Sequence, residues 1–313
     1  MSDTNELPRF PETTPNKEPA KSAEPKTDLA ENIVIVDDES LQQLYARENL
    51  SLYLRTLWQR RHFIWADTKS KSLSSGNGTY LGMVWVLLDP LLRVAVYALV
   101  FGLILKVDRG MDNFIGFLMI GVIFFGFFTA GITSGGNLIQ RSRSLINSFN
   151  FPKISLAVSL VLRQFVDHIV PGTVAVIGSL AFQWEKGLSI SIIGIIPIFF
   201  LVHLFAFGCI CFAARASAFF PDITKILNLV NRALFFTSGV FFTIERFDTH
   251  PLLTTIVEIN PIYQFLMAAR TCVMDGALPS LDVWIYLSTW SIVMALAGFL
   301  YFWQAEERYV AIR

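Results

Sequence analysis

Six long apolar runs constrain this chain more than any other feature. They lie at about residues 81–105, 114–134, 154–182, 188–213, 227–244 and 281–303. Most contain the roughly 20 residues that a helix needs to cross a hydrocarbon core of about 30 Å. The sequence therefore predicts an all-α integral membrane protein with six transmembrane helices.

The composition agrees with a membrane protein and hides an uneven distribution of charge. Of 313 residues, 53% are hydrophobic and 16% are charged, whereas a soluble domain carries about 25% charged residues. Residues 1–50 hold 5 basic and 11 acidic side chains, and the rest hold 20 and 14, so net charges of −6 and +6 cancel. The basic surplus lies in the membrane body, and no nucleic-acid partner is expected.

The chain divides into three parts. Residues 1–49 are rich in Pro, Glu, Lys and Ser, and we expect them to form a disordered, acidic cytoplasmic tail. Residues 50–72 place Leu54, Leu57, Trp58 and Trp65 on one helical stripe. This stripe predicts an amphipathic helix in the plane of the membrane surface, with a soluble core helix as the alternative. Residues 73–313 form the transmembrane domain.

The distribution of Lys and Arg among the short loops predicts the orientation. If the N-terminus is cytoplasmic, the inner side holds twelve basic residues: Arg55, Arg60, Arg61, Lys69, Lys71, Arg141, Arg143, Lys153, Arg215, Lys225, Arg308 and Arg313. The outer side then holds five: Lys106, Arg109, Lys186, Arg246 and Arg270. We therefore expect a multi-pass membrane protein with both termini in the cytoplasm.

One apolar stretch is broken before the last span. The pieces 252–259 and 262–269 are separated by Asn260-Pro261, each is too short to cross a membrane, and proline disfavours a helical residue before it. They are expected to be short re-entrant or interfacial helices on the outer side. The candidates for an outer gate are Asn260, Pro261, Tyr263 and Arg270.

Four motifs resemble, in order, those of ABC-2 type permeases. They are Tyr80-Leu81-Gly82-Met83-Val84-Trp85-Val86-Leu87-Leu88-Asp89-Pro90, Phe151-Pro152-Lys153, Phe220-Pro221-Asp222-Ile223, and Asn260-Pro261-Ile262 with Arg270. The resemblance covers about residues 50–313. Within the family, the chain looks most like the Wzm and TagG branch, which exports O-antigen, capsule, teichoic acid and related glycans. The family carries Arg where this chain has Pro221, so a charge pair made by that Arg is not expected here.

The resemblance implies a permease subunit of an ABC exporter for a lipid-linked polysaccharide of the O-antigen, galactan, capsule or teichoic-acid type. Family members work as a homodimer with two ATPase subunits. The segment from Ser74 to Thr79 lacks the lysine of a phosphate-binding loop. ATP and magnesium are therefore expected on the partner subunit, with no catalytic residue, cofactor or metal on this chain.

In the family, the loop between spans two and three holds a coupling helix that docks on the ATPase. Here this loop, Gln140–Ser155, carries three basic residues and no acid, with two phenylalanines for an apolar socket. The docking candidates are Arg141, Arg143, Phe149, Phe151, Pro152 and Lys153. The alternative is an ordinary basic cytoplasmic loop.

Aromatic rings and intramembrane charges supply candidates for the transport path. Sugar rings stack on aromatic faces, but only about a third of a helix surface can face a channel. The lining candidates are Trp85, Tyr97, Phe125, Phe128, Phe235 and Phe242. Asp89 with Arg93 and Arg163 with Asp167 have ion-pair spacing within predicted spans. They either neutralise each other or, with Arg232, form a polar entrance for a lipid pyrophosphate.

Three alternatives remain for the function. An ABC-2 exporter of a small lipid or drug would share the fold. A membrane polyprenyl-phosphate glycosyltransferase would require acidic clusters for a divalent metal, and no D-x-D pattern follows residue 50. A secondary transporter would be expected to show inverted repeats and ion ligands at the midplane, and neither is visible.

Overall fold

The structure is a computed structural model that describes residues 50–73, 84–106, 112–149, 151–183, 187–244 and 251–310. The regular structure in these residues is helical, and no strand occurs among them. The predicted acidic tail, residues 1–49, lies outside the described residues.

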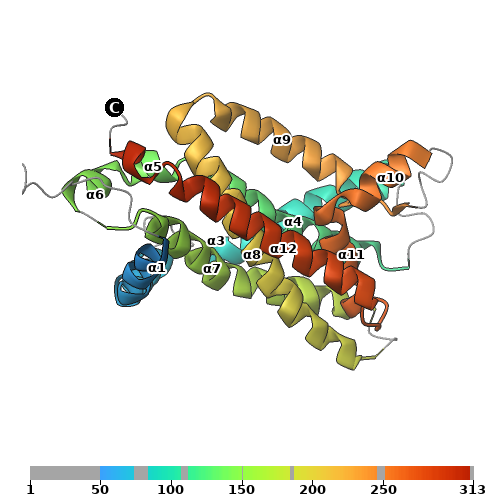
Figure 1. Ribbon diagram of the computed structural model, residues 1–313. Helices are drawn as coiled ribbons and strands as arrows, with labels where there is room; N and C mark the ends of the chain where they lie inside the picture. The colour runs from blue at the N-terminus through green and yellow to red at the C-terminus, as the bar shows by residue number, and fades with distance from the viewer. Residues whose placement is uncertain are drawn as a thin grey trace, which may run out of the picture. The chain divides into compact units, whose positions relative to one another are not determined.

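The described helices follow one another along the chain as a bundle with short connecting elements. They are α1 (Leu50–Gln59), α2 (Arg61–Leu73), α3 (Val84–Tyr97) with its π-helical continuation η2 (Ala98–Ile104), α4 (Phe114–Gly135), α5 (Leu138–Arg141), α6 (Arg143–Ser148), α7 (Ile154–Ala181), η4 (Ile190–Gly194), α8 (Ile195–Phe219), α9 (Ile223–Thr237), α10 (Pro251–Ile259), α11 (Pro261–Val273), α12 (Leu281–Trp303) and η6 (Glu306–Tyr309). In Figure 1, α5, α6 and the C-terminus lie at one end of this bundle, and α10 and α11 lie at the other. We call these the α5/α6 end and the α10/α11 end.

Five segments are long and apolar enough to cross a membrane alone. They are Leu87–Ile104, Phe114–Gly135, Ile154–Ala181, Ile190–Phe219 and Leu281–Trp303. These segments confirm five of the predicted spans, and the all-helical membrane fold with them.

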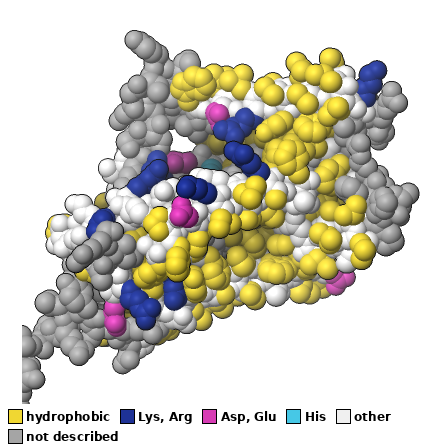
Figure 2. Space-filling model, turned by 90° about the horizontal axis from the view of Figure 1, so that it is seen from above, with side chains coloured by type: hydrophobic (Ala, Val, Ile, Leu, Met, Phe, Trp, Pro, Cys, Tyr) yellow, Lys and Arg dark blue, Asp and Glu magenta, His cyan; other side chains and the backbone are white. Residues whose placement is uncertain are grey.

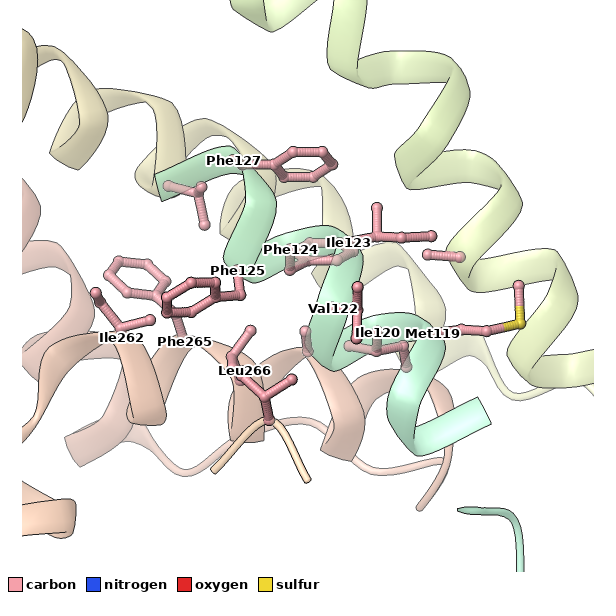
Figure 3. Packing of buried hydrophobic residues seen from close by; sticks show 14 of the residues in the cluster. Met119, Ile120, Val122, Ile123, Phe124, Phe125, Phe127, Ile262, Phe265 and Leu266 are labelled. Carbon is pink, nitrogen blue, oxygen red and sulfur yellow. The ribbon is translucent and has the colours of Figure 1, made fainter. Parts of the chain in front are cut away.

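The helix α4 lies at the centre of the bundle. Its sequence is apolar on every side, so it has no face suited to water, and it is buried along most of its length. Figure 3 shows Ile262, Phe265 and Leu266 of α11 on the side of α4 to which Phe125 points, whereas Phe127 points away from them. The core therefore consists of α4 and the faces of the surrounding helices that pack against it.

The remaining crossing is made by α9, whose helical part is shorter than predicted. Its 15 residues would extend only about 22 Å at 1.5 Å per residue. It runs antiparallel to α4, because Asn231 bonds to Thr133 and Phe235 packs against Phe125 further along. The helix ends at Thr237, and Gly239 then turns the chain with a φ of +64°. The predicted span 227–244 is thus a helix followed by a turn.

The broken stretch stays near the α10/α11 end. The helices α8 and α12 run parallel, since Ser291 bonds to the carbonyl of Leu201 and Arg215 bonds to that of Tyr301. One crossing therefore connects them, and α9 supplies it. The pair α10 and α11, bent by 76°, adds no net crossing, as the break at Asn260-Pro261 predicted.

The predicted surface helix is two helices in the structure, α1 and α2, which separate at Arg60. Tyr53 and Thr68 face inward, and the Thr68 hydroxyl donates to the carbonyl of Ser159 at 3.3 Å. Trp58 and Trp65 are 70% and 58% exposed. Exposed tryptophans of this kind suit the interfacial layer of a membrane.

Candidate functional site

A cavity of about 740 Å³ opens between α3, α4, α7 and α9. Its wall consists of Asp89, Pro90, Arg93, Tyr97, Phe101, Val122, Ile123, Phe125, Gly126, Phe127, Thr129, Ala130, Thr133, Ser134, Asp167, His168, Pro171, Asn231, Arg232, Phe235 and Phe236. Figure 2 shows a hollow on this face of the molecule with basic and acidic side chains at its edge. The four helices therefore bring together polar groups that the sequence places in separate spans.

The charged side chains occupy the half of the cavity nearer the α5/α6 end. The Arg93 guanidinium bonds to the Asp89 carboxylate at 2.9 Å, and both side chains are more than half exposed. Arg232 is exposed and forms no ion pair with another described residue. Charges are tolerated inside a membrane protein where they face a wet cavity, so this half is suited to a charged ligand.

The predicted arginines do not all reach the cavity. Arg93 and Arg232 line it, whereas Arg163 does not. Arg163 instead pairs with Asp167, which is on the wall, at 3.3 Å. Arg163 therefore reaches the cavity only indirectly, through its ion pair with Asp167.

Aromatic rings occupy the half nearer the α10/α11 end. Tyr97 and Phe125 each pack against Phe235, with ring centroids 5.3 and 5.1 Å apart. These three predicted lining residues are on the wall. The cavity thus changes from charged to aromatic along its length.

The other predicted lining residues lie elsewhere. Phe128 is fully buried against Phe205 and Phe265, because its position on α4 faces the opposite side from the cavity. Trp85 is 42% exposed and Phe242 packs at the edge of the core. Neither is on the cavity wall.

Two further residues on the cavity wall, Asn231 and His168, were not predicted from the sequence to face a ligand. Asn231 donates to the Thr133 hydroxyl at 3.2 Å, and His168 lies 3.0 Å from His203. The one available signal was their position beside Arg232 and Asp167 in otherwise apolar runs. Such a signal identifies a polar patch but not which way it faces.

The four gate candidates all hold the α10/α11 end together. Asn260 caps α11 by accepting from the N–H of Ile262 at 3.0 Å and donates to the Ser238 hydroxyl at 2.9 Å. Pro261 occupies the first turn of α11, where its missing N–H costs nothing. Tyr263 and Arg270 are buried. These contacts give the four residues a structural role at the α10/α11 end, and a gating role stays a prediction.

The predicted docking loop has an exposed part and a buried part. Arg141, Arg143 and Phe149 are exposed, with Phe149 at 63%. The three residues that follow, Phe151, Pro152 and Lys153, are buried within this chain. Only the first group is free to contact another subunit, while the second group anchors the loop.

One buried carboxylate provides that anchor. The Glu306 carboxylate accepts from the Tyr53 hydroxyl at 2.8 Å and from the backbone N–H of Lys153 at 2.6 Å. The Lys153 ammonium lies 3.9 Å away. Burial and the neighbouring Glu306 raise the pKa of Tyr53 well above its usual range, so the hydroxyl remains a donor. The contact joins α1, the end of the docking loop and the C-terminal segment.

Comparison with known proteins shows the family of this chain. The chain is 20% identical to the O-antigen export system permease protein RfbA of Myxococcus xanthus over 82% of this chain and 97% of the relative. It is 22% identical to an RfbA of Klebsiella pneumoniae over 74% and 87%, and 20% identical to the polysialic acid transport protein KpsM of Escherichia coli over 72% and 87%. Residues 64–274, more than half of the chain, match the ABC-2 type transporter family. The chain belongs to the ABC-2 type transporter family.

Proposed function

We propose that this chain is the permease subunit of an exporter that moves a lipid-linked polysaccharide across the bacterial plasma membrane. Two ATPase subunits on the cytoplasmic side supply the energy, and two copies of this chain form the permease. The names of the relatives support the substrate class. The cavity, charged at one end and aromatic at the other, is the observation that carries the proposal.

The two halves of the cavity match the two parts of such a substrate. With both termini in the cytoplasm, the charged half faces the side on which the lipid-linked glycan is made. Arg93 and Arg232 then meet the pyrophosphate, and charge-assisted hydrogen bonds contribute about 1.5–3 kcal/mol each. The sugar chain that follows meets Tyr97, Phe125 and Phe235, whose flat faces stack without binding a moving polymer tightly.

Neutralising Arg232 tests this assignment. In cells, Arg232→Gln is expected to lower the rate of glycan export about 10-fold to 100-fold, because one charge-assisted contact with the pyrophosphate is lost. Lipid-linked glycan should accumulate in the inner leaflet while surface glycan falls. The control is Lys225→Gln on the same helix, since the Lys225 side chain is 84% exposed and pairs with Asp222 at the start of the helix. Export at the parental rate in Arg232→Gln would contradict the proposal.

The exposed part of the docking loop is the proposed contact for the ATPase. Phe149→Asp is expected to abolish co-purification of the ATPase, because an unpaired charge in an apolar socket costs several kcal/mol. Leu278→Asp is the matched control: Leu278 is 61% exposed and lies in the loop before α12, at the other end of the bundle. Recovery of the ATPase at parental yield with Phe149→Asp would exclude this contact.

A further inference from the structure

The helices α1 and α2 lie against the bundle at the level where two of its spans begin and end. The Tyr53 ring lies 6.4 Å from the ring of Trp303, the last residue of α12. The Thr68 hydroxyl donates to the carbonyl of Ser159, near the start of α7. Because the ends of membrane-spanning helices mark the layer of lipid headgroups, both helices are placed in this layer.

One side of these two helices carries tryptophan and basic side chains in alternation. Trp58 and Trp65 are 70% and 58% exposed, and Arg61 and Lys69 are exposed as well. On α2, Arg61, Trp65 and Lys69 are four residues apart, which places them along one side of the helix. The Arg61 guanidinium carbon lies 5.5 Å from the centre of the Trp58 ring, so the row continues onto α1. We call these four residues the interfacial ridge.

The two basic side chains of the interfacial ridge keep their charge available for a ligand. Neither Arg61 nor Lys69 forms an ion pair with another described residue. Arg61 donates to the backbone carbonyl of Trp58 at 3.3 Å, a contact that leaves its positive charge unbalanced. The one carboxylate of α2, Asp67, is half-buried and is two residues from Lys69, so it faces away from the row.

This combination of side chains matches the headgroup of an anionic phospholipid. Indole rings favour the boundary between headgroups and acyl chains, and basic side chains near the surface attract anionic lipids. We propose that the interfacial ridge binds anionic phospholipids in preference to zwitterionic ones. With the predicted orientation, these are lipids of the cytoplasmic leaflet. The proposal concerns the surrounding membrane and is independent of the exported substrate.

The preference can be measured with two lipids that share their acyl chains and differ in the charge of the headgroup. These are dioleoylphosphatidylglycerol, which is anionic, and dioleoylphosphatidylcholine, which is zwitterionic. Native mass spectrometry of the full chain in detergent gives an apparent dissociation constant for the first bound molecule of each. The parent is expected to bind phosphatidylglycerol about 5-fold to 25-fold more tightly, because each basic residue near an anionic headgroup contributes about 5-fold.

The variants remove the charge and the rings of the ridge separately. Arg61→Gln and Lys69→Gln are each expected to weaken phosphatidylglycerol about 5-fold and to leave phosphatidylcholine unchanged. Trp65→Ala should weaken both lipids, because an indole ring anchors at the headgroup layer whatever the charge of the headgroup. The control is Lys225→Gln, since Asp222 already balances the Lys225 charge at 3.0 Å, and it should change neither lipid.

Three results would overturn the proposal. One is an equal dissociation constant for the two lipids in the parent. Another is unchanged binding of phosphatidylglycerol in both Arg61→Gln and Lys69→Gln. The third uses Arg232→Gln, which tests the cavity as the site of the anionic lipid. If this variant weakens phosphatidylglycerol and the two ridge variants do not, the lipid binds in the cavity and not at the interfacial ridge.

Discussion

Replacing Arg270 with leucine is expected to destabilise the protein by several kcal/mol, because each buried acceptor that loses its donor costs about 1–3 kcal/mol. Arg270 is 3% exposed, and it donates to the carbonyls of Gly239 at 2.8 Å and of Phe117 and Val240 at 3.2 Å each. Its guanidinium carbon also lies 3.3 Å from the centre of the Phe117 ring. Leucine would leave three buried acceptors without this donor.

The loss should be visible as a lower thermal unfolding midpoint of the purified protein, measured by intrinsic tryptophan fluorescence in detergent. Arg270→Lys should recover only part of the stability, because an ammonium cannot reproduce the planar fork of a guanidinium. Arg55→Leu, on the exposed face of α1, is the control. Equal midpoints for Arg270→Leu and the parent would show that the network is not stabilising.

A glycine contact between α8 and α12 predicts a second loss of stability. A Cβ atom on Gly208 would overlap the carbonyl of Met294, and one on Gly298 would lie 2.8 Å from the Cα of Gly208. Gly298→Ala is therefore expected to cost about 1–3 kcal/mol through overpacking. Gly298→Leu should prevent the two helices from meeting, and little folded protein should be recovered after size-exclusion chromatography.

The control for this prediction is the same substitution at a helical glycine with free space. A Cβ on Gly126 of α4 would meet no atom within 4 Å. Gly126→Ala should leave the unfolding midpoint unchanged or raise it slightly, because alanine favours a helix over glycine by up to about 1 kcal/mol. If Gly298→Ala behaves like Gly126→Ala, the two helices do not depend on backbone contact.

The sequence alone was sufficient for features that depend on local properties. Length and hydropathy predicted the helical membrane fold, since a segment of about 20 apolar residues has few other stable structures in lipid. The Asn260-Pro261 pair predicted the break between α10 and α11, because proline restricts the residue before it. Even so, the turn at Gly239 that shortens α9 was missed inside an apolar run.

The faces of the helices could not be predicted in the same way. Phe125 and Phe128 are both apolar positions on α4, yet Phe125 lines the cavity and Phe128 is buried against Phe205 and Phe265. A helix that is apolar on every side carries no pattern that sets its rotation. The packing of its neighbours sets that rotation, and with it the cavity wall.

Polar contacts across the chain depended entirely on the tertiary structure. Tyr53 and Glu306 are 253 residues apart, and Asn231 and Thr133 are 98 apart. Hydrogen bonds act over about 3 Å, so only the packed bundle brings such pairs together. The sequence by itself determined that this chain crosses a membrane as helices, and the tertiary structure decided which side chains face one another inside it.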